Sequence, residues 1–269
     1  MKKILLISLV LLFIGLSSCL SKSKETLWDS EITRKFVHHW IDYTTKNWAV
    51  LFGSTFLGLP LMQNPADMWI TQEIIAEIRP DFIVETGTFA GGSAAYYATI
   101  LKQVNDKGKV ITIDIDAKPR MASVNKLKKE DALLYNRVKE ISDTCIEFIT
   151  SDSVDPALIE RLKEQTKNKK VLITLDSCHS YEHVLNELIL YSQLVSPDSY
   201  LIVQDTFLDD KQEWIEKYAK CPGWKIKGGP LQAVHEFLRG NGDFKVDKSR
   251  ERFLFTFYPS GYLKKIIKK

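Results

Sequence analysis

The residues best suited to chemistry follow apolar segments of the chain, at the point where each segment ends. Asp114 ends "ITID", Asp176 ends "LITLD" and Asp205 ends "LIVQD". Continuous apolar runs of this length are typical of strands buried in a parallel sheet, and such strands end at one shared edge. We therefore expect one rim of polar groups, which also takes in Glu85, Gly87, Asp116, Ser151 and His179.

A glycine-rich turn, "ETGTFAGGS" at residues 85–93, joins the apolar "DFIV" to a helix of small residues. Gly87 removes a Cβ where a ligand would pass close to the backbone, and Gly91 and Ser93 stand at the helix start, where N–H groups are free. The carboxylate of Glu85 would repel a pyrophosphate, but it suits a cation such as the amino group of a methionine moiety. The turn thus looks like the first motif of S-adenosylmethionine-dependent methyltransferases.

The spacing of the residues in this turn argues against two other classes of ligand. A nicotinamide dinucleotide would require G-x-G-x-x-G, and nucleoside triphosphate hydrolysis would require a Walker lysine. Neither stands here. A glycine turn that only serves packing in an α/β protein of other function stays open.

Two further features fit S-adenosylmethionine in chain order. An acid at the end of the next strand would bind the ribose hydroxyls; Asp114 and Asp116 are candidates, and we favour Asp114. Ser151 and Ser153 follow the third strand and would lie near the adenine. Each match alone is weak, and their order together strengthens the prediction.

A second acidic set lies further along the chain. Asp176 and Asp205 end strands expected to be neighbours about 4.8 Å apart, so the two carboxylates could share a divalent cation such as Mg²⁺ and hold a substrate hydroxyl. His179 lies on the loop after Asp176 and could accept the hydroxyl proton. The plainer alternatives also stay open, namely a supporting histidine near a helix start and a turn-forming aspartate. His183, one helical turn on, is interpreted as a helix-face residue.

Composition places these residues in an ordinary globular protein. The 269 residues carry a formal charge of +3 and are 45% hydrophobic, which suits an α/β domain and gives no bulk attraction to nucleic acid. Apolar strands alternate with helices from residue 69 onward. We expect a mostly parallel sheet covered on both faces, with a helix over 120–136 and closing strands over 244–249 and 252–259.

The N-terminus predicts export. Lys2 and Lys3 precede an apolar run from Ile4 to Leu16, and "LSSC" resembles a bacterial lipobox. The expected organisation is a signal peptide at 1–18 with a lipid on Cys19, a tether at 19–26, a helical extension at 27–68 and the S-adenosylmethionine-binding domain at 69–269. The lipid would anchor the protein to a membrane. A cleaved signal with a chance cysteine, or an uncleaved anchor, are the alternatives.

Five longer stretches resemble the cephalosporin hydroxylase family: "LPLMQNPADMWITQEIIAEIRPDFIVETGTFAGGSAA", "VITIDID", "LDSCHSYEHVLNELILYSQLVSPDSYLIVQDT", "GGPLQAVHEFL" and "RFLFTFYPSGYLKK". That family resembles S-adenosylmethionine-dependent O-methyltransferases, among them cephamycin-pathway and rhamnosyl enzymes. The resemblance implies a Rossmann-like class I methyltransferase sheet with an antiparallel C-terminal strand, and often Mg²⁺. It carries the metal ligands to Asp176, Gln204 and Asp205. Gln204 departs from the family's acidic residue.

These observations predict methyl transfer from S-adenosylmethionine to a hydroxyl of a small molecule or sugar, with Asp176 and His179 as catalytic residues. S-adenosylmethionine is made in the cytosol, which conflicts with an exported lipoprotein. A non-catalytic surface lipoprotein that kept the fold and binds a ligand or glycan is therefore the second hypothesis. The sequence leaves the oligomeric state open, a homo-oligomer included.

Overall fold

The computed structural model of the chain describes residues 31–46, 53–210, 228–253 and 255–267. The expected signal peptide at 1–18, the acylated Cys19 and the tether at 19–26 lie outside these residues. Within the described part of the chain, no helix is both long and apolar enough to cross a membrane.

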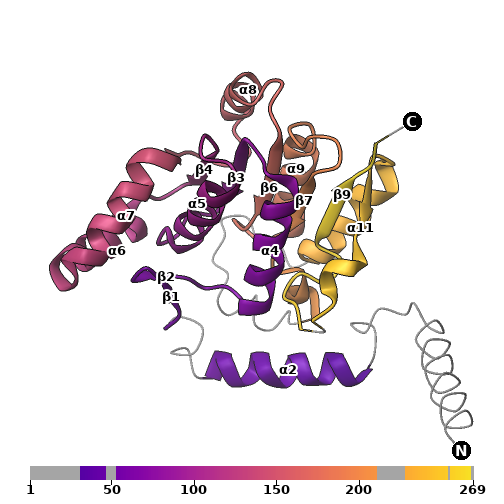
Figure 1. The fold of residues 1–269 in the computed structure, drawn as a ribbon. Helices are drawn as coiled ribbons and strands as arrows, with labels where there is room; N and C mark the ends of the chain where they lie inside the picture. Colours follow the sequence, from indigo (N-terminus) through magenta and orange to yellow (C-terminus); the bar gives the residue numbers. More distant parts are fainter. Residues whose placement is uncertain (1–30, 47–52, 211–227, 254, 268–269) are drawn as a thin grey trace, which may run out of the picture.

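Seven strands form one sheet in the order β5-β4-β3-β6-β7-β9-β8 (Figure 1). The strands from β5 to β7 run parallel, β9 runs antiparallel to β7, and β8 pairs antiparallel with β9. This arrangement confirms the expected mostly parallel α/β fold with an antiparallel C-terminal strand. The strand bounds are Phe82–Thr86 for β3, Lys109–Asp114 for β4, Ile146–Thr150 for β5, Val171–Leu175 for β6, Tyr200–Val203 for β7, Phe244–Val246 for β8 and Tyr262–Lys265 for β9.

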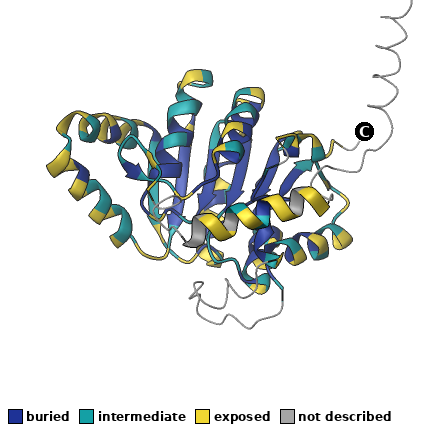
Figure 2. Ribbon diagram, turned by 90° about the horizontal axis from the view of Figure 1, so that it is seen from below, coloured by how far each residue is buried: buried dark blue, intermediate teal, exposed yellow. Residues whose placement is uncertain are grey.

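Helices cover both faces of the sheet, as the continuous apolar strands predict. Successive strand residues point to opposite faces, so Ile83 packs into one buried cluster and Val84 into another. The first cluster includes side chains of α4 and α5, and the second includes side chains of α8, α9 and α11. Figure 2 shows the buried strands between these helices. Their bounds are Pro65–Ile78 for α4, Gly92–Val104 for α5, Pro156–Gln165 for α8, Tyr181–Tyr191 for α9 and Pro230–Gly240 for α11.

Local sequence signals define both ends of α4. The Asn64 side chain accepts a hydrogen bond from the Ala66 backbone N–H at the start of α4, and Pro65 occupies the first turn. The helix ends at Ile78, and the next residue, Arg79, has a left-handed backbone just before Pro80. The domain boundary expected between residues 68 and 69 therefore falls inside a continuous helix.

The helix expected over residues 120–136 is two helices, α6 (Lys118–Glu130) and α7 (Ala132–Cys145). Asp131 separates them with an extended backbone, and its side chain accepts a hydrogen bond from the Leu134 N–H. Aspartate favours such a cap over a helix interior, which explains the break. Both helices pack with the short hairpin of β1 (Thr55–Phe56) and β2 (Leu59–Pro60).

The C-terminal segment differs most from expectation. Residues 252–259 form no strand in the described part of the chain, and β9 lies at Tyr262–Lys265 instead. Asp67, a buried side chain of α4, accepts hydrogen bonds from the Phe257 N–H at 2.7 Å, the Tyr262 hydroxyl at 2.8 Å and the Thr256 hydroxyl. A carboxylate in the interior thus takes the backbone N–H that a strand would give to its neighbour.

The same segment receives α2 (Glu31–Lys46), the part of the expected helical extension that precedes the hairpin. The Trp40 ring contacts Phe255 edge to face at 4.6 Å between centroids, and Val37 is buried. Apolar contact with the C-terminal segment therefore positions α2 (Figure 1).

Replacing Asp67 with alanine should lower the free energy of unfolding by about 3 kcal/mol, because a backbone N–H and two hydroxyls would lose their buried acceptor. Urea unfolding followed by circular dichroism measures the change. Asp143→Ala is the matched control, since the Asp143 side chain is 59% exposed on α7 and should cost less than about 0.5 kcal/mol. Equal losses in the two variants would contradict an anchoring role for Asp67.

Candidate active site

A cavity of about 670 Å³ opens at the carboxyl ends of the parallel strands, and we call it the main cavity. It is lined by the turn after β3, by the loops after β4, β5, β6 and β7, and by the segment before α4. The sequence-predicted residues that line it are Gly87, Ser93, Asp114, Ser151, Ser153, Asp176, His179 and Asp205. Glu85, Gly91, Asp116 and Gln204 were also expected at the site, but they are not among its lining residues.

The turn after β3 depends on close backbone packing. Gly87 has φ of 88°, and a Cβ at this position would lie 1.9 Å from the carbonyl oxygen of Asp176. Gly91 has φ of 86° at the start of α5. A Cβ on Gly92 would lie 2.3 Å from the carbonyl oxygen of Pro60. These glycines therefore serve contacts within the chain first, and of the two predicted ones only Gly87 also lines the main cavity.

Glu85 lies beneath that turn, not in the cavity wall as the sequence suggested. Its side chain is fully buried, and one oxygen accepts a hydrogen bond from the Thr112 hydroxyl at 2.6 Å. The other oxygen has no hydrogen-bond partner among the described residues. Burial raises the pKa of Glu85 to about 7, although the hydrogen bond from Thr112 opposes the shift. Glu85 therefore supports the turn from below.

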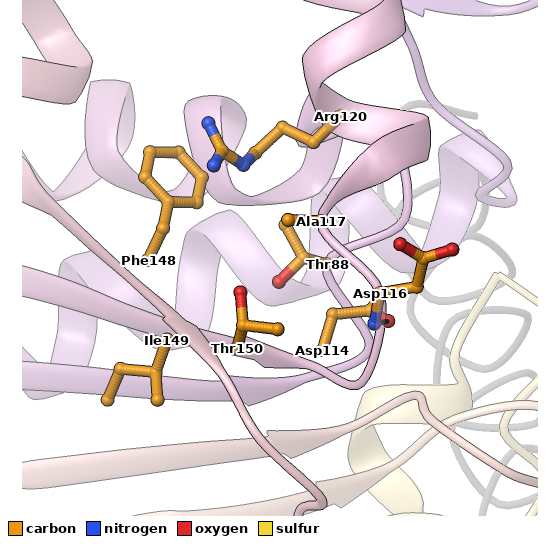
Figure 3. A pocket seen from close by; sticks show the side chains of 8 residues that line it. All are labelled: Thr88, Asp114, Asp116, Ala117, Arg120, Phe148, Ile149 and Thr150. Carbon is orange, nitrogen blue, oxygen red and sulfur yellow. Dashed lines mark hydrogen bonds between the residues drawn. The ribbon is translucent and has the colours of Figure 1, made fainter.

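Asp114 and Asp116 have separate positions at the end of β4. Asp114 faces the main cavity, and its two oxygens accept hydrogen bonds from the N–H groups of Phe89 at 2.8 Å and Asp116 at 3.0 Å. The Asp116 side chain instead accepts from the Lys118 N–H at 2.9 Å, where α6 begins. Figure 3 shows both carboxylates at a second, small pocket. Only Asp114 is thus placed to contact a ligand of the main cavity.

The loop after β5 brings Ser151 and Ser153 to the main cavity together with a histidine whose place the sequence did not reveal. His183 Nε2 lies 3.0 Å from the Ser153 hydroxyl and 3.4 Å from a carboxylate oxygen of the buried Glu187. Burial lowers the pKa of His183. The contact with the Glu187 carboxylate and its negative charge outweigh this effect, so the pKa of His183 is raised overall. His183 lines the cavity from the first turn of α9, although its spacing suggested an ordinary helix-face residue.

Asp176, His179 and Asp205 come together at the ends of β6 and β7, and we call them the strand-end group. One ligand atom from each lies within 4.8 Å of the others. His179 Nε2 is 3.9 Å from an oxygen of Asp176 and 3.6 Å from an oxygen of Asp205. The three side chains are 17%, 20% and 28% exposed, in chain order, so all of them remain accessible from the cavity.

The electrostatics of the strand-end group follow from burial. Burial raises the pKa of Asp176 well above its usual value, and the charges of Asp205 and Glu85 add to the effect. Burial also raises the pKa of Asp205. It lowers the pKa of His179 to about 4, which leaves the imidazole neutral at physiological pH. Crowded carboxyl groups of this kind are poised to take up a cation or to share protons.

Gln204, expected with this group as a metal ligand, points away from it. The side chain is 1% exposed, and its amide nitrogen donates to the Thr174 hydroxyl at 2.6 Å and to the Tyr97 hydroxyl at 3.1 Å. Its oxygen accepts from the Tyr258 hydroxyl at 2.7 Å. Because residues alternate between the faces of a strand, Gln204 at the end of β7 enters the core while its neighbour Asp205 faces the cavity.

A second glutamine occupies part of the space beside Asp176. The Gln63 amide nitrogen, from the segment before α4, donates to an oxygen of Asp176 at 2.7 Å. The Tyr258 hydroxyl contacts the Gln63 oxygen as well as that of Gln204. Sequence spacing gave no sign of Gln63, because 113 residues separate it from Asp176.

Comparison with known proteins identifies relatives over most of the chain. The family model "Rhamnosyl O-methyltransferase/CmcI" matches residues 49–266. Rhamnosyl O-methyltransferase of Mycobacterium tuberculosis is 33% identical over 215 residues, which are 78% of this chain and 77% of that protein. The enzyme of the same name from Mycobacterium leprae is 30% identical over 78% of this chain and 82% of its own length.

Solved structures agree at the level of the fold. An apo structure of CmcI aligns with a TM-score of 0.54 at 19% identity, over 80% of this chain and 77% of that one. A second CmcI structure, described as containing Mg and SAM, aligns with a TM-score of 0.53 at 18% identity, over 80% and 78% of the two chains.

The buried carboxyl groups predict a pH-dependent stability. Asp67 and Glu85 have folded pKa values of about 7, so the folded protein holds protons that the unfolded chain releases between about pH 4 and 7. The free energy of unfolding should therefore fall as pH rises through this window. Glu85→Gln should reduce that slope by up to about 1.4 kcal/mol per pH unit.

Urea unfolding at several pH values between 5 and 7.5 would measure this slope. Glu160→Gln is the control, because the Glu160 side chain is 71% exposed. A slope that is the same in Glu85→Gln and in the unsubstituted protein would contradict the assignment.

Proposed function

The chain belongs to the Rhamnosyl O-methyltransferase/CmcI family, and we propose that it methylates a hydroxyl of a sugar. It is an S-adenosylmethionine-dependent O-methyltransferase by that membership, and the sugar is the proposed part. The observation that carries the proposal is a single cavity that joins Asp114 and the glycine turn to the strand-end group. A cofactor and an acceptor hydroxyl would thus meet in one enclosed space.

We propose that the cofactor occupies the side formed by β3, β4 and β5. The Asp114 carboxylate would accept hydrogen bonds from the ribose hydroxyls, since two backbone N–H groups already fix its direction. Ser151 and Ser153 would lie at the adenine. The methionine moiety would lie between Gly87 and Ser93, where the first turn of α5 offers N–H groups and a positive dipole end to its carboxylate.

The acceptor would occupy the other side, formed by the strand-end group and by the segment that carries Leu61, Met62 and Gln63. Apolar and polar groups of this kind suit a sugar ring, which has an apolar face and hydroxyls at its edge. The 33% identity with a rhamnosyl O-methyltransferase supports a sugar over other hydroxyl compounds.

For this reaction the protein must align the reacting atoms and remove the proton of the acceptor hydroxyl. The acceptor oxygen forms a bond to the methyl carbon, the carbon–sulfur bond breaks, and its electron pair neutralises the sulfonium. The sulfonium methyl is already activated, so most of the catalysis comes from holding oxygen, carbon and sulfur in line. The hydroxyl proton passes to the strand-end group, in which we propose His179 and Asp176 as the catalytic residues. With a pKa of about 4, His179 is neutral but a weak base.

The divalent ion implied by the family fits the described residues only in part. Asp176 and Asp205 present carboxylate oxygens to the cavity, which suit a hard dication. Gln204 does not present its oxygen, because Tyr258 occupies it. A bound ion would supply positive charge that favours the ionised form of an acceptor hydroxyl.

We also propose that the chain is attached to a membrane through Cys19. The apolar run from Ile4 to Leu16 and the "LSSC" that ends it support this proposal. Detection of palmitate label on the protein, lost in Cys19→Ala, would test it. Protease protection in intact cells would then tell whether the domain lies with the cytosolic pool of S-adenosylmethionine.

Calorimetric titration with S-adenosylhomocysteine tests the cofactor site. We expect binding in the micromolar range, weakened at least tenfold by Asp114→Ala because the ribose acceptor is lost. Asp116→Ala is the matched control and should change the affinity less than threefold. No binding by a folded sample would contradict the enzyme and leave the non-catalytic surface lipoprotein as the better account.

Release of S-adenosylhomocysteine in the presence of a panel of rhamnosides and simple phenols tests the acceptor. Asp176→Asn and His179→Gln should each lower kcat at least 100-fold while the affinity for S-adenosylhomocysteine stays within threefold. His235→Gln, an exposed histidine on α11, is the control for the second variant. Turnover of phenols but not of rhamnosides would overturn the sugar assignment.

A further inference from the structure

We propose that His179 replaces residue 204 as the third metal ligand, so that Asp176, His179 and Asp205 together bind a first-row transition-metal dication such as Mn²⁺ or Zn²⁺ in preference to Mg²⁺. The inference deepens the proposed function, because the ion would lie where the acceptor hydroxyl is placed. It can be tested by metal binding alone.

The Gln204 side chain points away from the strand-end group. Its amide nitrogen already makes two hydrogen bonds in the core, and its oxygen accepts one from Tyr258. To reach the cavity, the side chain would have to leave these partners and place their hydroxyls in the interior without them. An unsatisfied buried polar group costs about 1–3 kcal/mol, so three lost contacts oppose the rotation. Gln204 is therefore held in the core.

The His179 ring lies close to both carboxylates of the strand-end group. Its Nε2 lies 3.9 Å from an Asp176 oxygen and 3.6 Å from an Asp205 oxygen, and both separations exceed the ~3.2 Å limit of an N–H···O hydrogen bond. Among the described residues, neither ring nitrogen of His179 makes a hydrogen bond. Two atoms that each lie about 2.1 Å from one ion are separated by at most about 4.2 Å. The nitrogen thus stands at ligand spacing from both carboxylates.

A hydrogen bond orients the Asp176 carboxylate, and the backbone conformation orients that of Asp205. Gln63 donates to one oxygen of Asp176, while the other oxygen of that carboxylate faces His179. Ligands oriented by an outer hydrogen bond are typical of metal centres. Asp205 has a left-handed backbone with φ of 55°, and this conformation turns its side chain toward the same point while Gln204 stays in the core. The chain thus aims three donors at one place from two strands.

The donor set determines which ions fit. Mg²⁺ prefers oxygen ligands in a near-octahedral arrangement, whereas imidazole suits transition-metal dications. The family pattern has an acidic residue at the position of Gln204. A ligand set with the His179 imidazole in place of that carboxylate carries one negative charge less, which weakens the binding of a hard ion more than that of a softer one. With only three protein ligands, a bound ion would have room for an acceptor hydroxyl from the cavity.

If His179 Nε2 binds the ion, it cannot also accept the hydroxyl proton. Of the two catalytic residues proposed above, only Asp176 would then remain as the proton acceptor. If His179 is a ligand, its removal abolishes ion binding; if it is only a base, ion binding survives its removal. The two roles are therefore separable without measuring methyl transfer.

The experiment uses the purified full-length chain, freed of metal with a chelator. Mn²⁺ binding is followed by the loss of its free-ion electron paramagnetic resonance signal, with Mg²⁺ and Zn²⁺ as competitors. We expect one site per chain that binds Mn²⁺ at least tenfold more tightly than Mg²⁺. Pulsed measurements on bound Mn²⁺ should show coupling to an imidazole nitrogen, and this signature is independent of any variant.

Two variants complete the test. His179→Ala should weaken Mn²⁺ binding at least tenfold and abolish the nitrogen coupling. His183→Ala removes the neighbouring cavity histidine and should leave Mn²⁺ affinity within threefold. Bound Mn²⁺ without nitrogen coupling, equal affinity for Mg²⁺, or no ion binding by a folded sample would each overturn the proposal.

S-adenosylhomocysteine binding is measured on the same samples. A protein that binds S-adenosylhomocysteine but binds no metal ion would defeat the metal assignment and leave the proposed methyltransferase function intact. Ion binding without cofactor binding would support the metal assignment and defeat the proposed function.

Discussion

The backbone contact between Gly87 and the Asp176 carbonyl is the constraint on which the site depends. A Cβ at Gly87 would lie 1.9 Å from that carbonyl oxygen, so only glycine lets the turn after β3 lie against the end of β6. The turn carries the proposed methionine site, and Asp176 belongs to the proposed acceptor site. Their direct contact determines how far a methyl donor and its acceptor would be apart. In methyl transfer that distance matters more than any single hydrogen bond.

Around this contact lie carboxyl groups that are fully buried or only partly exposed. Burial raises the pKa of Glu85, Asp176 and Asp205, and the charges of Asp205 and Glu85 raise the pKa of Asp176 further. Hydrogen bonds from Thr112 and Gln63 offset part of the cost. Groups arranged in this way reduce stability but respond strongly to a nearby positive charge, whether a sulfonium, a proton or a metal ion. The same electrostatics that cost stability therefore prepare the cavity for charged ligands.

Side-chain direction at the strand ends decides which groups can act. Gln204 and Asp205 are neighbours in the chain, yet one enters the core and the other faces the cavity. The Tyr258 hydroxyl contacts both Gln204 and Gln63, so the C-terminal segment supports the acceptor side from behind. Asp67 holds that segment in place of an expected strand. The fold thus uses polar contacts in its interior to position groups that no single strand could place.

The sequence by itself determined the alternation of strands and helices, the parallel sheet and the rim that collects Asp114, Asp176 and Asp205. These features follow from local apolar patterns and from glycine spacing, both of which can be recognised from residues that are neighbours in the sequence. Only the tertiary structure decided that Glu85 and Gln204 are buried, that Gln63 and His183 reach the cavity, and that Asp67 binds Thr256 and Phe257 where a strand was expected. Each of these depends on side-chain direction or on contacts between residues far apart in the chain, and local periodicity carries no information about either.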